Sequence, residues 1–320
     1  MTDTPTPRIV KLGQHEWMFP SEQLQQLPDS SHLLGNRDAL LKELTERGYL
    51  FIRGLHDRDE VLRARLAVIK HIKDTGAGRL EDGTPWEDGV LAQRCGKGCI
   101  PFLEGVKEIT HNENVLKVIE GQRAFQFFGT LFGTPVRTFD FKWLRAIYRE
   151  AFTGAHVDNV YMCRGTDQLC TMWTPMGDVT TNMGTLAVCE GSHKLPEFKH
   201  FQETYGNFDA EKEGLSGTGW FTEDPQEICS RFGGQWKTSD FMAGDVLIFT
   251  MRTVHMSSTN TTDLLRISCD TRWQPAHLPI DVRYIGDTNI DKITFGLQYS
   301  GGDEDKHHVT MEEMKKSWGF

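Results

Sequence analysis

The sequence predicts a mainly β protein with flanking helices, built as a sandwich or barrel of antiparallel strands under a helical N-terminal cover. From Pro135 onward, short runs of branched and aromatic residues alternate with Gly, Pro, Asn and Asp, a texture typical of antiparallel sheets. Before that point the chain carries longer segments with helix start and stop signals. No internal repeat or low-complexity linker divides the 320 residues, so a single domain over 1–320 is the simplest interpretation.

The part before Pro135 is expected to form the cover. Its first thirty-odd residues are rich in Pro, Thr, Gln and Ser and predict an arm with at most short structure. Asp57 followed by Glu60 resembles a capping box, and six glycines without periodicity predict a long loop over 75–100. The expected elements are helices over 36–47, 57–74, 114–120 and 123–132 and a strand over 49–52. We therefore assign 1–134 to a helical cover with the opening strand.

The remainder is expected to divide into a barrel and a tail. The strands lie within 135–275, and inside this range the segment 198–234 is polar and contains glycines, which suits a surface lid. Residues 276–320 form a C-terminal extension, in which Thr310 and Glu313 predict a capped last helix.

Composition and charge narrow the class of protein. A formal net charge of -10 without a clustered basic surface disfavours nucleic-acid binding. No apolar run is long enough to span a bilayer, and the polar N-terminus lacks the layout of a signal peptide. We expect a cytoplasmic protein with no membrane or nucleic-acid partner, and its oligomeric state stays open.

The cysteines point to the same compartment. Seven cysteines form an odd set scattered along the chain, which favours free thiols in a reducing environment. Cys95 and Cys99 are the only close pair, and no second pair at zinc-finger spacing accompanies them. We expect both to be ordinary loop or core residues.

A candidate metal site begins in the stretch GAHVDNVYM, residues 154–162. If this stretch is a strand, residues two apart face the same side, so His156 and Asp158 present an imidazole and a carboxylate to one point. The plain alternative is a polar pair that hydrogen-bonds on a sheet surface. A metal site therefore needs a third ligand.

The candidate third ligand lies in residues 244–273, which predict two strands joined near 260–263. With the turn between Thr261 and Thr262, antiparallel pairing sets His255 opposite Ser268 and Ser257 opposite Arg266. Alternation then separates two faces. The polar face carries His255, Ser257, Arg266, Ser268, Asp270 and Arg272, and the apolar face carries Leu265, Ile267, Cys269 and Trp273.

Arg266 links this polar face to a ligand. A buried arginine costs several kcal/mol unless an anion pairs with it, and a salt bridge to Asp270 is one way to supply that anion. A second interpretation explains both the histidine–aspartate pair and the buried arginine. Two histidines and one carboxylate bind iron, and the arginine binds the far carboxylate of a bound dicarboxylic acid. That donor set is the facial triad of non-haem Fe(II) oxygenases.

These residues resemble the phytanoyl-CoA dioxygenase family of Fe(II)/2-oxoglutarate oxygenases. His156-x-Asp158, the distal His255 and Arg266 eleven residues beyond it match the family order. The segments TMWTPMGDVTTNMGTLAVCEGSHK (171–194) and GDVLIFTMRTVH (244–255) are similar to the family's segments, so the resemblance runs from about 140 to 275. It implies a double-stranded β-helix, a jelly-roll, cupin-like barrel, with 135–275 as the catalytic barrel.

The resemblance also implies an activity and roles. Fe(II) would be bound by His156, Asp158 and His255, and the cosubstrate 2-oxoglutarate by Arg266, Ser257, Trp173 and Thr171; for Trp173 and Thr171, barrel packing is the plain alternative. With O2, the enzyme would hydroxylate or otherwise oxidise a C–H bond of a small organic molecule, coupled to decarboxylation of 2-oxoglutarate to succinate and CO2. Because Asp158 is retained, the resemblance does not point to the related halogenases.

The substrate itself is not legible from the sequence. Arg145, on the strand before the metal pair, and Arg94 and Lys97, in the glycine-rich loop, are candidate substrate contacts. No basic cluster suited to a nucleotide is evident, so we lean away from a coenzyme A ester.

Two alternatives remain open at this point. One is a non-enzymatic cupin-like protein that binds a metal or an anion, because one fold hosts many functions. The other is an iron oxygenase independent of 2-oxoglutarate, which leaves Arg266 unexplained. The complete triad and the spacing of Arg266 favour the 2-oxoglutarate enzyme.

Overall fold

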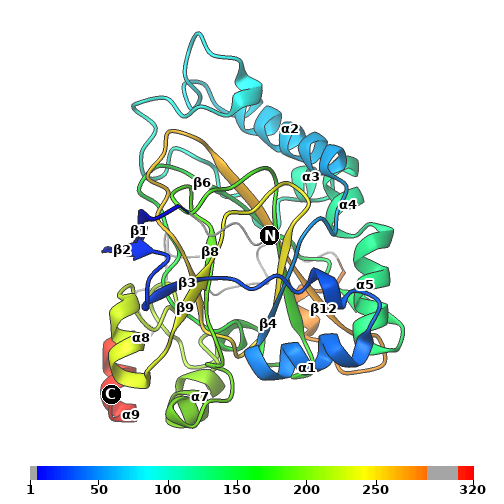
Figure 1. The fold of residues 1–320 in the computed structure, drawn as a ribbon. Coiled ribbons are helices and arrows are strands. Elements are labelled where there is room, and N and C mark those ends of the chain that lie inside the picture. The colour runs from blue at the N-terminus through cyan, green and yellow to red at the C-terminus, as the bar shows by residue number, and fades with distance from the viewer. Residues whose placement is uncertain (1–5, 287–308) are drawn as a thin grey trace.

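The fold is mixed α/β, with two main β-sheets, a separate two-stranded sheet, and helices on the outer sides of the main sheets (Figure 1). The computed structural model describes residues 6–286 and 309–320. The expected sheets and flanking helices are present, and helices form a large share of the described residues both before Pro135 and inside the predicted lid.

The larger sheet carries one wall of the interior. Its order is β4 (Tyr49–Ile52), β10 (Val246–Thr250), β7 (Cys170–Pro175), β12 (Arg266–Pro275) and β5 (Val136–Thr138), and β6 (Trp143–Ile147) also pairs with β12. All these pairs are antiparallel. Every residue of β12 is buried, because strands flank it and helices cover its outer face.

The smaller sheet has the order β11 (His255–Ser257), β8 (Leu186–Cys189), β9 (Trp236–Thr238) and β3 (Leu24–Gln26). Before it, β1 (Arg8–Leu12) and β2 (His15–Phe19) form an antiparallel hairpin. The N-terminal arm therefore has more structure than expected, since it contributes this hairpin and, through β3, a strand parallel to β9.

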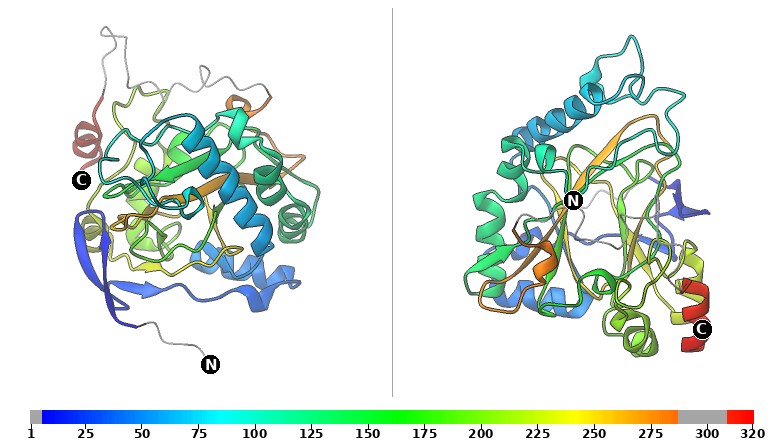
Figure 2. Two further views of the ribbon diagram at one scale, coloured as in Figure 1. Left: turned by 90° about the horizontal axis from the view of Figure 1, so that it is seen from above. Right: turned by 180° about the vertical axis from the view of Figure 1, so that it is seen from behind.

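Helices cover the outer face of the larger sheet (Figures 1 and 2). They are α1 (Arg37–Arg47), α2 (Arg58–Asp74), α3 (Lys107–Thr110), α4 (Glu113–Ile119) and α5 (Gln122–Phe132). The side chains of Asn36 and Asp57 accept the backbone N–H groups of Ala39 and Glu60, which satisfies donors that a helix start leaves free. The four expected helices and the strand 49–52 are thus confirmed, whereas α3 was not predicted.

The apolar face of β12 lies under these helices. Ile267 and Cys269 join a core cluster with residues of α2 and α4. Trp273 stacks on Phe128 of α5, with ring centroids 4.8 Å apart. The opposite face of β12 therefore points between the two sheets.

The predicted hairpin between 255 and 273 is wrong. β11 pairs with β8 of the smaller sheet, whereas β12 pairs with β6 and β7 of the larger one. Asn260 holds the connection between them: its side-chain amide donates to the carbonyls of Ile147 and Leu264. Pairing with strands that are distant in sequence is therefore favoured over the hairpin that the local turn residues suggested.

The segment 198–234 is anchored by buried aromatic side chains. It contains α7 (Lys199–Glu203) and α8 (Pro225–Phe232), and the rings that it contributes to one core cluster are Phe198, Phe201, Tyr205, Phe221 and Phe232. Movement of this segment as a lid stays a prediction. The last helix, α9 (Met311–Trp318), lies beside α8 (Figure 1), and Lys315 pairs with Glu227. Its capping box between Thr310 and Glu313 is confirmed.

The described residues also form short 3-10 helices: η1 (Ser31–Leu33), η2 (Trp86–Asp88), η3 (Pro196–Phe198), η4 (Tyr205–Asn207) and η5 (Val282–Tyr284). In the described part of the chain no helix is long and apolar enough to cross a membrane.

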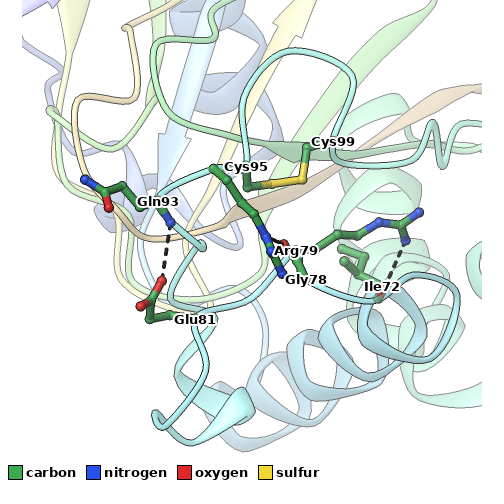
Figure 3. Close-up of a disulfide and its surroundings, with 8 residues drawn as sticks. Ile72, Gly78, Arg79, Glu81, Gln93, Cys95 and Cys99 are labelled. Atoms are coloured by element: carbon green, nitrogen blue, oxygen red, sulfur yellow. Dashed lines mark hydrogen bonds between the residues drawn. A yellow bond between two sulfur atoms is a disulfide. The ribbon is translucent and has the colours of Figure 1, made fainter.

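Cys95 and Cys99 form a disulfide (Figure 3). The expectation that these two are ordinary free thiols is wrong. A turn through Gly96 and Gly98 brings their Cα atoms to 5.3 Å, a separation that a disulfide can span. The free cysteines are Cys163, Cys170, Cys189, Cys229 and Cys269.

Candidate active site

His156, Asp158 and His255 gather between the two sheets, and all three are buried. One ligand atom from each lies within 4.8 Å of the others. His156 and His255 are backbone partners in an antiparallel bridge, with N–H···O distances of 3.0 and 2.9 Å. The expectation that His156 and Asp158 share one face of a strand is wrong, because the chain turns after Val157 and Asp158 precedes helix α6 (Asn159–Met162).

Both histidine rings are held in the same way. Nδ1 of His156 lies 2.8 Å from the carbonyl of Gly154, and Nδ1 of His255 lies 3.0 Å from the carbonyl of Thr253. Since a carbonyl only accepts, each Nδ1 carries the proton and each Nε2 keeps a free lone pair. Both Nε2 atoms lie 3.8 Å from Oδ1 of Asp158, so three donor atoms converge.

The charge states suit this convergence. Burial lowers the pKa of His156, and the neighbouring His255 lowers it further. Burial also lowers the pKa of His255, against the opposing effect of Asp158. Both imidazoles are therefore neutral at pH 7, the form in which histidine binds metals.

Asp158 is held ionised by two neighbours. Thr171 on β7 donates its hydroxyl to Oδ2 of Asp158 at 2.5 Å. Nη2 of Arg272 on β12 lies 3.3 Å from the same oxygen. Burial alone would raise the pKa of Asp158, but Arg272 and the two histidines outweigh it and hold that pKa well below its usual range. Sequence reasoning placed Arg272 on the polar face and gave it no role; only its contact with Asp158 reveals one.

Arg266, at the start of β12, is a buried cation without a carboxylate partner in the described residues. Its Nη1 donates to the hydroxyl of Ser268 at 2.5 Å, and its buried Nε has no hydrogen-bond partner within residues 6–286 and 309–320. Arg266 does not form the alternative salt bridge to Asp270. The carboxylate oxygen Oδ2 of Asp270 instead lies 3.8 Å from Nε of Arg145. Burial, helped by Arg145, lowers the pKa of Arg266 to about 9, which leaves it charged at pH 7.

The structure places the other predicted cosubstrate residues at different distances from Arg266. The ring of Trp173 lies 5.9 Å from the guanidinium of Arg266 and also packs against Phe241. Ser257 is buried, and its hydroxyl accepts the backbone N–H of Thr153 at 2.8 Å. Thr171 contacts the triad through Asp158.

A cavity of about 520 Å³ reaches the triad through His156. Of the predicted substrate contacts, Arg145 lines this cavity and forms an ion pair with Glu104 at 2.7 Å. Arg94 and Lys97 are exposed and do not line it. Their loop nevertheless reaches the cavity through residues that sequence reasoning did not single out, from Gly98 to Glu104.

The fold and this donor set define a class of protein, the non-haem iron oxygenases. The sequence pattern of the phytanoyl-CoA dioxygenase family (PhyH) matches residues 44–268, and the chain belongs to that family. It is an Fe/2-oxoglutarate-dependent oxygenase.

Known proteins similar to this chain include enzymes from two Streptomyces species. The chain is 26% identical over 269 residues to the 1-deoxypentalenic acid 11-beta-hydroxylase of Streptomyces exfoliatus, covering 80% of this chain and 87% of the relative. The hydroxylase of the same name from Streptomyces arenae is 26% identical over 264 residues, covering 78% of this chain and 84% of the relative.

Two solved structures share the fold. The epimerase SnoN in complex with Fe3+, alpha ketoglutarate and nogalamycin RO has a TM-score of 0.53 at 20% identity, covering 85% of this chain and 94% of that one. EctD from S. alaskensis in its apoform has a TM-score of 0.53 at 14% identity, covering 89% of each chain. At these identities the likeness concerns the fold alone.

Proposed function

We propose that His156, Asp158 and His255 hold the iron as a facial triad. The observation that carries this assignment is the convergence of the two Nε2 atoms on Oδ1 of Asp158, each at 3.8 Å. Two neutral imidazoles and one carboxylate fit Fe(II), and they leave coordination positions for a cosubstrate and O2.

We further propose that Arg266 binds the distal carboxylate of 2-oxoglutarate. Its buried guanidinium, which has no carboxylate partner in the described residues, supports this role, because a planar fork of donors matches a carboxylate. Ser257 is assigned a hydroxyl contact to the same carboxylate, and Trp173 a wall of the cosubstrate site. Thr171 is better placed to hold Asp158 than to contact 2-oxoglutarate.

The proposed reaction is hydroxylation of a C–H bond. The bound iron supplies the activation of O2, coupled to decarboxylation of 2-oxoglutarate to succinate and CO2. The chain's own residues do the remaining work: Thr171 and Arg272 orient Asp158, the carbonyls of Gly154 and Thr253 orient the two imidazoles, and the cavity beside His156 positions the substrate and excludes water. The Streptomyces relatives, named as hydroxylases of a small carboxylic acid, support hydroxylation rather than another oxidative outcome.

The finer fold and the cellular setting belong to the same proposal. The two sheets would close into a double-stranded β-helix within 135–275, with 1–134 as the cover, 198–234 as a lid and 276–320 as an extension. The triad draws His255 from one sheet, whereas Asp158 contacts Arg272 and Thr171 of the other, which supports a site between two halves of a barrel. The proposed compartment is the cytoplasm, and the proposed substrate is a small molecule.

The test has two parts. Binding of Fe(II) and of 2-oxoglutarate to the metal-stripped protein is measured first, and turnover is measured second. Without O2, we expect wild type to bind Fe(II) and 2-oxoglutarate, Asp158→Ala to lose Fe(II) binding, and Arg266→Met to keep Fe(II) but lose 2-oxoglutarate. Arg58→Met, which removes an exposed arginine, is the matched control. In air, succinate release should depend on Fe(II) and fail in Asp158→Ala.

The alternatives give different results. Fe(II) binding with no 2-oxoglutarate binding in wild type would favour an oxygenase independent of that cosubstrate. Binding of both without oxidation of any compound in a metabolite screen would favour a non-enzymatic protein. Absence of both bindings would reject the proposal.

A further inference from the structure

Several aromatic side chains line the cavity beside His156. Phe102, Trp143, Tyr148, Trp220 and Tyr284 line it, and they come from segments far apart in the sequence. Flat rings that converge on one space provide apolar contact area for a rigid ring system. A volume of about 520 Å³ is within the ordinary range of small-molecule sites.

Every charged side chain that lines the cavity, in the part of the chain that the structure describes, is already paired. Arg145 lies 2.7 Å from Glu104, and the third charged lining residue, Glu211, lies 2.5 Å from Arg283. A charged substrate group would therefore enter the cavity without a free counter-charge, and burying an unpaired charge costs several kcal/mol.

The positive and negative charges of the groups around the triad are also equal in number. Arg145 and Arg272 lie close to the carboxylates of Glu104, Asp158 and Asp270, and Arg266, which has no carboxylate partner among the described residues, adds a third positive charge. Three positive and three negative groups leave no net charge. Fe(II) and the dianion of 2-oxoglutarate add two charges of each sign, so the loaded site stays balanced without a charged substrate.

Polar recognition is still available at one place on the wall. Arg145 has five N–H donors, and the contacts to Glu104 and Asp270 both involve Nε. Arg145 and Glu104 retain some exposure, with side chains 26% and 17% accessible, and both line the cavity. A hydroxyl or carbonyl oxygen can hydrogen-bond there without bringing a charge.

We propose that the substrate is an uncharged, ring-containing molecule whose hydroxyl or carbonyl oxygen is bound by the Glu104–Arg145 pair. This inference rests on the proposed function, since it takes the cavity as the substrate site of the oxygenase. It also distinguishes this chain from the Streptomyces relatives, whose named substrate is an acid.

The experiment uses three fluorescent probes on one ring skeleton: 1-pyrenemethanol, 1-pyrenecarboxylate and 1-pyrenemethylamine. Their binding to the full chain is measured by fluorescence anisotropy, first for the metal-stripped protein and then without O2 with Mn(II) and 2-oxoglutarate. We expect the alcohol to bind about 10-fold more tightly than the acid or the amine, because neither charge finds a partner.

A charge-removing variant locates the effect. Glu104→Gln leaves Arg145 with less compensation, so the acid should bind about 10-fold more tightly than to wild type, whereas the alcohol, which gains no ion pair, should not bind more tightly. Glu108→Gln removes the same charge from a side chain that is 81% exposed and should change neither value.

Two outcomes would overturn the inference. Binding of the acid or the amine to wild type as tightly as the alcohol would show that the cavity accepts a charge. Binding of none of the probes would reject a ring-containing occupant. Because the probes are tested with and without metal and cosubstrate, a failure here is distinguishable from failure of Fe(II) or 2-oxoglutarate binding.

Discussion

Arg272 lies 3.3 Å from Asp158, from Nη2 to Oδ2, and both side chains are buried. The guanidinium of Arg272 also lies over the ring of Trp143, 4.4 Å from its centroid. Asp158 is thereby kept ionised and in place in the metal-free protein. The carboxylate of the triad is held by β12 through Arg272 and by β7 through Thr171, so two strands of the larger sheet pre-organise it.

The Arg272–Asp158 pair should show strong coupling in the metal-free protein. We expect Asp158→Asn and Arg272→Met each to lower the free energy of unfolding by about 3 kcal/mol, because either change leaves a buried charge unpaired. The double variant should lose about 2 kcal/mol less than the sum of the two. Chemical denaturation of the four proteins measures this coupling, and additive effects would refute it.

Thr171 should affect metal affinity rather than stability alone. Thr171→Val keeps the shape of the side chain and removes the donor to Asp158, so the dissociation constant for Fe(II) should rise about 10-fold. Thr174→Val, on the same strand, is the control, because the buried hydroxyl of Thr174 has no hydrogen-bond partner in the part of the chain that the structure describes. Anaerobic titration compares the two, and equal effects of both variants would contradict the role of Thr171.

His56 should make stability fall with acidity. Burial, with a smaller effect from Arg123, lowers the pKa of His56 to about 4. His56 then binds a proton near pH 6.5 in the unfolded chain but not in the folded chain. The free energy of unfolding therefore decreases as pH falls from about 6.5 to 4. The full effect is on the order of 3 kcal/mol.

The matched variants for this pH effect are His56→Gln and His32→Gln. The first should flatten the dependence of unfolding free energy on pH between about 6.5 and 4, because glutamine does not titrate. The second removes an exposed histidine and should leave the dependence close to that of wild type. Denaturation of metal-free protein at several pH values tests this, and equal slopes for wild type and His56→Gln would disprove it.

The disulfide predicts a thiol count. Titration of the denatured, unreduced protein should detect the five free cysteines, and prior reduction should raise the count to all seven. Cys95→Ser with Cys99→Ser should give five in both conditions. A count of seven without reduction would mean that the purified protein does not hold this bond.

The helices of the cover could be predicted because their signals are local. The Asn36 and Asp57 caps lie next to the helices that they begin, and Gly48, with φ 87°, supplies the left-handed residue between α1 and β4. The pairing of β11 and β12 could not be predicted in this way. The strands that they pair with are β8 for β11 and β6 and β7 for β12, none of which adjoins them in sequence.

The same distinction between local and long-range features applies to the candidate site. The spacing of His156, Asp158, His255 and Arg266 was sufficient to nominate a metal and cosubstrate site, although the strand expected at Asp158 is a turn into α6. The aromatic cavity was not foreseen, because its wall residues come from segments with no common pattern.

By itself the sequence determined the local helices, the apolar and polar faces of β12 and the residue types available for iron and 2-oxoglutarate chemistry. Only the tertiary structure decided that Arg272 pairs with Asp158 while Arg266 has no carboxylate partner among the described residues, and that Glu104 and Arg145 neutralise each other on the cavity wall. Periodicity and capping act within a few residues of the chain, whereas burial and ion pairing depend on which distant segments meet.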